Sequence, residues 1–426
     1  MRVVQAFRFE RDPNGAQRVT LARHVGAARF AYNWGLSRCL EALEQGLPLP
    51  SAAQLHQAWN IWKRENAPGW VEVSKCAPQE AFRDLERAFR NGRQGRAGRP
   101  RFQRKKRLDD HKARLTGSIR VFPRHVQLPR IGKVRTKERA DKLLQEKKAR
   151  ILSATLSREA DRWFVSLACE VERPDPAPRN GDGVGVDLGR MSFLALSDGT
   201  HIEAPKPLAR GLRGLRRRSR PLFRKRKGSR NHRQASLRQA KLHRRIKNIR
   251  RDFLHKITTA LAKTQSAIGG EDLPGKALAR GRLSRSVADV GWGMFRRMLE
   301  YKGQWYGARL ILAPRDFPST PLGSRCGHRN GRLPFSQRVF RCAACGLEMD
   351  RDLHAAIHLR NYGLAVLNSS TASSAGRDAC RGPQPVEDRL GCPRSLWRRN
   401  GGEPVDAPRV EEAGSDRSWI SPRGVK

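Results

Sequence analysis

Residues 340–359 read FRCAACGLEMDRDLHAAIHL and bring together two kinds of metal-ligating side chain. Cys342 and Cys345 have the C-x-x-C spacing of half a zinc knuckle. Asp352 opens an Ala-rich segment typical of a short helix, where its carboxylate suits a hard cation such as Mg²⁺. A purely structural module rarely needs a thiolate site joined directly to an acidic site. The pattern therefore predicts a nuclease whose catalytic carboxylate lies beside a small nucleic-acid-binding finger.

Two further carboxylates stand in contexts that suit the same chemistry. Asp187 ends the apolar run that contains Val184 and Val186, and Glu271 also follows an apolar run. Phosphodiester hydrolysis needs an activated water and a stabilised leaving oxygen, which two Mg²⁺ ions about 4 Å apart can supply. A single Asp after a strand is ordinarily a turn or cap residue. The prediction of a Mg²⁺ site therefore depends on Asp187, Glu271 and Asp352 together.

The finger has three candidate zinc ligands and lacks an obvious fourth. Cys326 lies sixteen residues before Cys342, but Gly323 occupies the position where a four-cysteine site would have its first ligand. His328 is a possible substitute, although C-x-H spacing is poor for one tetrahedral ion. A degraded finger held by packing is the alternative. The remaining cysteines are expected in apolar cores (Cys39, Cys76, Cys169) or in the tail (Cys380, Cys392).

The composition demands a polyanionic partner. The 426 residues include 87 Lys and Arg against 40 Asp and Glu, giving a formal net charge of +47 and a pI of about 11.5. Such a chain repels itself unless it binds a polyanion, and nucleic acid is the expected one. The sequence has no run of apolar residues long enough for a membrane span, and its first residues lack a signal peptide. We expect a prokaryotic-type cytosolic, nucleoid-associated protein with reduced cysteines.

Other hydrolytic chemistries lack their motifs. The sequence contains neither a G-x-S-x-G nucleophile elbow nor a P-loop, which excludes a typical serine hydrolase and an ATP-driven enzyme. A general RNA-binding protein, whose affinity would fall steeply with salt, is the plainest alternative.

The pattern of apolar and polar residues predicts the helices and strands that must position these side chains. A helix is expected after Asn14, which forms a capping box with Gln17, and a second over roughly 76–91. Residues 115–136 and 150–172 are typical of β structure. A Pro-rich linker then precedes a domain that opens near Gly181 with a hairpin. A helix with an apolar stripe from Leu242 to Leu261 should turn its cations, among them Arg244, Arg245, Arg250 and Arg251, toward phosphate. The tail is expected to be disordered.

Many ordered motifs make the chain similar to the TnpB (OrfB) family of transposon-associated proteins, from about residue 5 to 380. The carriers are Tyr32-Asn33-Trp34, Pro100-Arg101-Phe102, Leu128-Pro129-Arg130-Ile131-Gly132, Gly185-Val186-Asp187-Leu188-Gly189, Lys227-Gly228-Ser229-Arg230, Arg250-Arg251-Asp252-Phe253-Leu254-His255-Lys256, Glu271-Asp272-Leu273, Tyr301-Lys302, Cys326-Gly327 and the block from Cys342 to Ala356.

The resemblance implies an α/β plus β architecture. It comprises an RNase H-like (RuvC) nuclease domain, an amino-terminal wedge β-barrel, a helical recognition insert and a small zinc-knuckle-like insert. The expected bounds are wedge 1–18 and 106–178, recognition insert 19–105, nuclease core 179–315 and 349–366, knuckle 316–348, and a disordered tail 367–426.

The resemblance also implies a function. It predicts an RNA-guided DNA endonuclease that hydrolyses a double-stranded target in a Mg²⁺-dependent reaction, with a guide RNA from the transposon end and Zn²⁺ in the knuckle. The three catalytic metal ligands would be Asp187, Glu271 and Asp352. The expected nucleic-acid contacts are Tyr32, Asn33, Arg101, Phe102, Lys105, Lys106, Lys227, Arg230, Arg244, Arg245, Arg250 and Arg251. A small type V CRISPR effector and a cleavage-deficient RNA-guided DNA-binding protein are the alternatives. A transposase that moves DNA itself is disfavoured.

Several positions depart from the family pattern. Gly323 replaces a knuckle cysteine, and His354 replaces an Asn that is usual two residues after the last carboxylate. Gly269 and Gly270 should weaken the strand before Glu271, and Pro221 should interrupt a basic helix. Together these departures indicate a copy under weak selection.

Overall fold

The protein is described by a computed structural model. The described residues are 1–67, 70, 72–104, 112–177, 183–189, 192–273, 284–315, 317, 321–331 and 337–374, with side chains described to 368. The chain divides into two compact units, Met1–Thr371 and Ala372–Lys426. All the described strands, and every described helix except the last turn of the final one, belong to the first unit.

The amino-terminal strand pairs with a strand far along the chain. The first sheet is antiparallel, in the order β1-β7-β6-β2, and its register pairs Arg2 with Glu172 and Arg11 with Trp163. The β structure predicted for 150–172 is present, and every second side chain of β7 from Trp163 to Val171 is buried. The strands are β1 (Arg2–Arg11), β2 (Ala113–Leu115), β6 (Arg150–Glu159) and β7 (Arg162–Glu172).

A second antiparallel sheet lies within the same region. It has the order β3-β4-β5 and is joined to the first sheet by a bridge between Arg11 and Thr136. The elements are β3 (Arg120–Phe122), β4 (His125–Leu128), β5 (Gly132–Arg135) and the short helix α4 (Ala140–Glu146). The described strands thus pair as two sheets, and the closed wedge barrel stays a prediction.

Three helices pack on these sheets and share their hydrophobic core. They are α1 (Gly15–Glu44), α2 (Ala52–Asn66) and α3 (Cys76–Arg93). The capping box predicted for Asn14 and Gln17 is present. Helix α2 was not predicted, although Ser51 and Gln54 form an equivalent capping box at its start. One apolar cluster contains Trp59 and Phe82 together with the buried side chains of β7, so the helices are not an independently packed domain.

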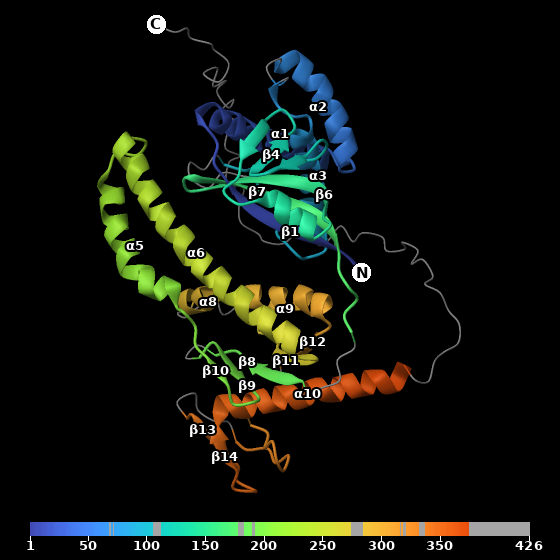
Figure 1. The fold of residues 1–426 in the computed structure, drawn as a ribbon, viewed down its shortest axis with the longest axis vertical. Coiled ribbons are helices and arrows are strands. Elements are labelled where there is room, and N and C mark those ends of the chain that lie inside the picture. The colour runs from blue at the N-terminus through green and yellow to red at the C-terminus, as the bar shows by residue number, and fades with distance from the viewer. Residues whose placement is uncertain are drawn as a thin grey trace. The chain divides into compact units, whose positions relative to one another are not determined.

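The second half of the described chain is built on a mixed sheet. Its order is β10-β9-β8-β11-β12, with parallel pairing of β8, β11 and β12 and antiparallel pairing of β8, β9 and β10 (Figure 1). The strands are β8 (Val184–Asp187), β9 (Leu194–Leu196), β10 (His201–Ile202), β11 (Ala267–Glu271) and β12 (Arg309–Ala313). The predicted hairpin at 184–196 corresponds to β8 and β9.

The described helices between β10 and β12 are a long basic pair and two shorter helices. They are α5 (Pro207–Arg224), α6 (Arg230–Thr264), α8 (Ser284–Val290) and α9 (Trp292–Tyr306). Helix α5 continues through Pro221, so the expected interruption at that residue is wrong. Gly291, in the left-handed region at φ 79°, separates α8 from α9. Buried Lys302 on α9 donates from Nζ to the Thr258 and Thr259 hydroxyls of α6, each at 2.7 Å, and fixes this helix pair.

The last described elements of the chain are a small β-hairpin and a long helix. These are β13 (Val339–Arg341), β14 (Glu348–Asp350) and α10 (Arg351–Ser374). The prediction of a short helix after Asp352 is wrong, because α10 runs through Gly363 to Ser374. The predicted disorder beyond it, with Cys380 and Cys392, lies outside the described residues. No helix among those described is long and apolar enough to cross a bilayer.

Candidate active site

Two of the predicted carboxylates end neighbouring parallel strands. Strands β8 and β11 pair with Val184 opposite Ile268 and Gly185 opposite Gly269. Continued along both strands, this register brings Asp187 and Glu271 side by side at their carboxyl ends. Ligands commonly bind at this edge of a sheet with parallel strands. The sequence contexts that singled out the two residues therefore correspond to one location.

Helix α10 brings the third carboxylate to the same edge by lying directly on the sheet. A Cβ on Gly185 would stand 1.7 Å from the Ala356 carbonyl oxygen, and one on Gly269 would stand 2.1 Å from the Leu359 carbonyl oxygen. Only glycine permits so close an approach of backbones. The interpretation of Gly269 as a weak point of the strand is therefore wrong, since β11 forms and that glycine seats the helix.

The start of α10 is fixed by its own cap. Asp350, the last residue of β14, accepts hydrogen bonds at Oδ1 from the backbone N–H groups of Asp352 and Leu353, both at 2.9 Å. The Asp352 carboxylate lies 3.7 Å from Nη1 of Arg338 and 3.8 Å from Nε of Arg351. Its side chain is 18 % exposed. Asp352 is thus held at the mouth of the helix, between two guanidinium groups.

The three carboxylates share one electrostatic field. The pKa of Asp187 is raised to about 7, first by burial and then by the negative charges of Glu271 and Asp352, while Arg351 opposes the rise. Carboxylates that resist joint ionisation in this way are neutralised well by divalent cations. Within the described chain, however, only a cysteine cluster brings three ligand atoms within 4.8 Å of one another. The oxygen atoms of Asp187, Glu271 and Asp352, which form the acidic edge of the sheet, are therefore too far apart in this structure for all three to bind one ion.

His354, which replaces the Asn usual in the family, contacts the finger. Its buried ring stacks on Phe340 with centroids 3.6 Å apart, and its Nε2 accepts a hydrogen bond from the Ser324 N–H at 3.3 Å. Burial lowers the pKa of His354 to about 4, with His358 adding to the effect, so the ring is neutral at physiological pH. His354 thus anchors both halves of the knuckle to α10.

The cysteine cluster is formed as the spacing predicted. The Sγ atoms of Cys326, Cys342 and Cys345 lie within 4.8 Å of one another, and the first two are 3.4 Å apart. The backbone N–H of Cys345 lowers the pKa of Cys342 to about 7, although desolvation opposes this. His328 is exposed and is not a member of the cluster. The donor set suits a thiophilic ion such as Zn²⁺ with one protein ligand short of four.

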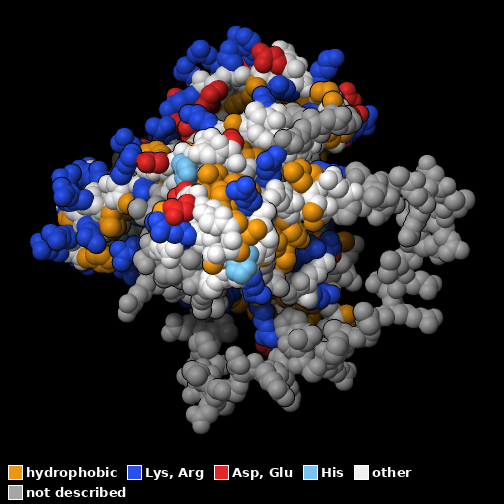
Figure 2. All heavy atoms as spheres, turned by 90° about the horizontal axis from the view of Figure 1, so that it is seen from below, with side chains coloured by type: hydrophobic (Ala, Val, Ile, Leu, Met, Phe, Trp, Pro, Cys, Tyr) orange, Lys and Arg blue, Asp and Glu red, His pale blue; other side chains and the backbone are white. Residues whose placement is uncertain are grey.

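Of the residues predicted to contact nucleic acid, some are exposed to solvent and others bind partners within the protein. Lys and Arg side chains gather toward the end of the α5–α6 pair (Figure 2). Exposed members of the predicted set are Arg101, Phe102, Lys227, Arg230, Arg245 and Arg251. Lys105 and Lys106 lie outside the described residues.

Four other residues of the predicted set are buried or bind partners within the protein. Tyr32 is only 8 % exposed, and Asn33 binds the backbone of Gln103 through hydrogen bonds of 2.8 and 3.0 Å. Arg244 donates to Asp161 at 2.7 Å and to the Glu159 carbonyl at 3.0 Å. Asn33 therefore positions the segment that carries Arg101 and Phe102.

Arg250, the fourth of these residues, is likewise structural. Its Nε donates to the Asp289 carbonyl at 2.7 Å, and its Nη2 donates to the carboxylate of the same residue at 3.1 Å. Asp289 is buried and also caps the first N–H groups of α5 at Leu208 and Ala209. Arg250 thus completes a network that joins α5, α6 and α8, and its expected contact with phosphate stays a prediction.

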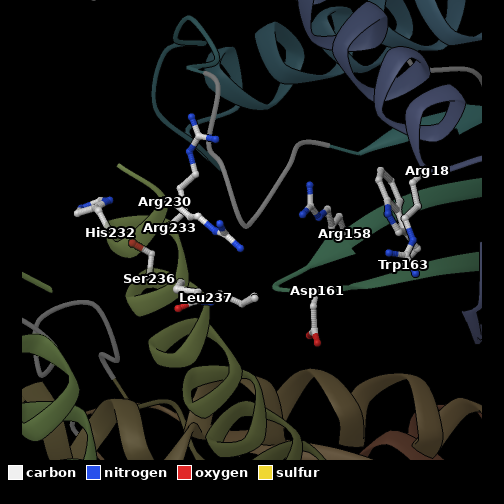
Figure 3. A pocket seen from close by; sticks show the side chains of 10 residues that line it. Arg18, Arg158, Asp161, Trp163, Arg230, His232, Arg233, Ser236 and Leu237 are labelled. Carbon is white, nitrogen blue, oxygen red and sulfur yellow. The ribbon is translucent and has the colours of Figure 1, made fainter. Parts of the chain in front are cut away.

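A basic cavity between the β6–β7 hairpin and α6 was not predicted from the sequence. The cavity has a volume of about 580 Å³. Arg230 and Arg233 of α6 lie on one side, with Arg18, Arg158 and Trp163 on the other (Figure 3). Glu159 and Asp161 flank the hairpin turn and hold it beside α6 through ion pairs with Lys241, Arg244 and Lys247.

Comparison with solved structures places the fold in a known class. The complex titled "Cryo-EM structure of the Cas12f1-sgRNA-target DNA complex" contains a chain that matches with a TM-score of 0.51. The match covers 81 % of this chain and 83 % of that one at 14 % identity. The protein therefore has a Cas12f1-like fold of mixed helix and sheet.

Curated relatives define the family. "Putative RNA-guided DNA endonuclease Rv2885c" of Mycobacterium tuberculosis is 34 % identical, over 91 % of this chain and 93 % of its own length. "Putative RNA-guided DNA endonuclease InsQ" of Escherichia coli is 32 % identical, over 88 % and 96 %. The chain belongs to the TnpB (OrfB, IS605) family, as the resemblance of its motifs indicated.

Three family profiles match separate parts of the chain. "Probable transposase" matches residues 166–281, and "Cas12f1-like, TNB domain" matches 292–359, which contains the cysteine cluster. "Helix-turn-helix domain" matches 1–47, where the structure has strand β1 followed by the single helix α1.

Proposed function

We propose that this protein is an RNA-guided DNA endonuclease that cleaves a double-stranded target by divalent-cation-dependent hydrolysis. The observation that carries the proposal is the convergence of Asp187, Glu271 and Asp352 at one edge of the mixed sheet. The relatives named as RNA-guided DNA endonucleases support it, as does the order of the five strands, which suits an RNase H-like (RuvC) core.

Bound Mg²⁺ would supply an activated water and charge neutralisation at the scissile phosphate. The three carboxylates would hold it, and the width of the acidic edge favours two ions that each contact part of the set. Arg338 and Arg351 lie beside Asp352 and can orient a phosphate oxygen by charge-assisted hydrogen bonds. The packing of α10 on Gly185 and Gly269 keeps the carboxylates in place.

The basic surfaces would hold the guide RNA and its duplex with the target. The 87 Lys and Arg exceed the 40 Asp and Glu by 47, and this unbalanced charge favours a polyanionic partner. The cavity lined by Arg230, Arg233 and Arg158 offers several guanidinium groups, which suit the phosphates of a nucleic-acid backbone. Base pairing with the guide would carry sequence specificity, and the protein would contact the backbone.

The cysteine cluster would give the finger a Zn²⁺ site. Cys326, Cys342 and Cys345 lie together on two hydrogen-bonded turns, and the finger is docked on α10 through His354. Its position next to Asp352 in the chain suits a module that presents DNA to the acidic edge.

Two linked experiments test the proposal. RNA that co-purifies with the protein, expressed with its native downstream flank, should be one discrete species reaching into the transposon end. A supercoiled plasmid carrying the matching target should then be cut in Mg²⁺, and Asp187→Ala should abolish cleavage while leaving RNA and target binding nearly unchanged. Asp252→Ala, which removes an exposed carboxylate on α6, is the matched control and should cut normally.

Each result separates the candidates. A heterogeneous pool of host RNA would contradict a guided mechanism. Cleavage by the Asp187→Ala variant equal to that of the parent would contradict the assigned site. Binding without cleavage by the parent would favour a non-cutting RNA-guided protein.

A further inference from the structure

We propose that the finger binds a thiophilic divalent ion through three thiolates and leaves the fourth coordination position open to an exchangeable external ligand. That ligand is water at rest and can be replaced by a neutral nitrogen donor or a small thiol. The inference concerns the cysteine cluster alone and does not depend on the nuclease proposal.

The two halves of the finger are built on the same backbone turn. In one half, the Gly323 N–H donates to the His328 carbonyl at 2.8 Å and the Gly327 N–H donates to the Gly323 carbonyl at 2.9 Å. In the other half, the Cys342 N–H donates to the Leu347 carbonyl at 2.9 Å and the Gly346 N–H donates to the Cys342 carbonyl at 3.0 Å.

The dihedral angles follow the same repeat. Gly327 has φ 70° and Gly346 has φ 66°, each directly after the second cysteine position of its turn. Residues 323–328 and 342–347 are therefore equivalent, with Cys326 matching Cys345. By this equivalence Gly323 occupies the position of Cys342, which is a ligand position.

The space around Gly323 agrees with this assignment. A Cβ on Gly323 would lie 3.2 Å from Sγ of Cys326 and 3.3 Å from Sγ of Cys342. The side chain of residue 323 would thus emerge directly into the group of thiols. Because glycine has no side chain, the three thiolates surround a position that no ligand from this residue can fill.

No other described side chain completes the set. His328 follows Cys326 by two residues but is exposed and outside the group whose ligand atoms lie within 4.8 Å. Nε2 of His354 is bound by the Ser324 N–H. The part of the chain that the structure describes therefore supplies three ligands and no fourth.

The frame of the site does not depend on a fourth protein ligand. Asn330 joins the two turns, because its Nδ2 donates to the Arg341 carbonyl at 2.9 Å and its Oδ1 accepts from the Ala343 N–H at 3.1 Å. Leu322 and Arg329 form a β-bridge at the base of the first turn. These bonds keep the two halves in register. Three thiolates with a divalent ion carry one net negative charge, which favours a neutral ligand such as water in the open position.

Cobalt substitution under anaerobic conditions tests the inference on the full chain. In excess Mg²⁺, which would occupy the carboxylates, the thiolate charge-transfer absorbance of Co²⁺ should saturate at one equivalent per chain. Its intensity should be about three quarters of that in Gly323→Cys, as three thiolates compare with four. Imidazole added to the Co²⁺ form should shift the visible bands of the parent and leave those of Gly323→Cys unchanged. The Gly323→Cys variant should also bind Co²⁺ at least about tenfold more tightly.

Three outcomes would overturn the inference. The parent could bind no Co²⁺ while Gly323→Cys binds it, which would mean a decayed finger held by packing. The bands of the parent could ignore imidazole, which would mean that the protein fills the position. His328→Ala could abolish binding, which would identify His328 as the fourth ligand. The imidazole response needs only the parent protein, so the test stands even if Gly323→Cys does not fold.

Discussion

Gly269 of β11 and Leu359 of α10 are in backbone contact at the point where the helix crosses the sheet. A Cβ on this glycine would stand 2.1 Å from the Leu359 carbonyl oxygen, a distance that requires the backbone to move. The neighbouring Gly270 is different, because the nearest atom to its Cβ would be Leu312 Cδ2 at 3.6 Å. The two adjacent glycines thus have separate consequences for the fold.

Gly269→Ala should destabilise the protein by about 3 kcal/mol or more, because overpacking against a backbone group cannot be relieved by a rotamer change. Gly270→Ala should lie within about 1 kcal/mol of the parent, since the added methyl makes an ordinary contact. Urea-induced unfolding followed by circular dichroism measures both. Equal midpoints for the two variants would contradict the role assigned to Gly269.

The raised pKa of Asp187 makes the stability of the metal-free protein depend on pH. Its ordinary value is 3.8 and its folded value is about 7, so between these values the folded state binds the proton that the unfolded state releases. Stability is therefore lost as pH rises from about 4 to 7, and the full penalty remains above 7. In a chelator at pH 8, Asp187→Asn should raise the thermal midpoint, and the difference should vanish near pH 4. The exposed Asp252→Asn should show no such pattern.

Adjacent arginines on α6 should separate folding from nucleic-acid binding. The side chain of Arg244 is 13 % exposed and bound to Asp161, whereas Arg245 is exposed. Arg244→Ala should lower the unfolding free energy by about 1 to 2 kcal/mol, with part of the loss screened by salt. Arg245→Ala should fold normally and reduce the slope of log affinity for RNA against log salt by about one. Filter binding at several salt concentrations and thermal unfolding provide the two measurements, and a reversed assignment would contradict the structure.

His354→Ala should release the finger from α10 without altering the cysteines. The substitution removes the stack on Phe340 and the acceptor of the Ser324 N–H, and it leaves a cavity worth about 3 kcal/mol. Limited proteolysis should then cut within 321–350, and the amide of Ser324 should exchange faster. His328→Ala, an exposed change in the same finger, should leave both unchanged.

The positions of the three carboxylates were predictable from sequence because each stands where an element ends or begins. Asp187 and Glu271 follow apolar runs, and Asp352 opens an Ala-rich helix. The close packing of that helix on the sheet was not predictable from sequence. Gly269 and Gly270 are adjacent glycines, and only the structure shows that Gly269 contacts the α10 backbone whereas Gly270 faces the Leu312 side chain.

The composition also could not predict which arginines of α6 face solvent and which bind partners within the protein. Arg244, Arg245 and Arg250 share one helix and one charge, yet partners from distant segments engage the first and last. Tyr32 lies on a helical stripe that periodicity could have assigned to the core. The basic cavity needs the β6–β7 hairpin beside α6, a juxtaposition that no local pattern encodes.

Asp350 is at once the last residue of the finger hairpin and the cap of α10, and one residue separates it from Asp352. The finger and the carboxylate therefore have no flexible joint between them. A shift of the hairpin therefore also moves the residue that caps the helix at Asp352. Under the proposed function, capture of DNA by the finger and alignment of the carboxylates would be coupled through this one residue.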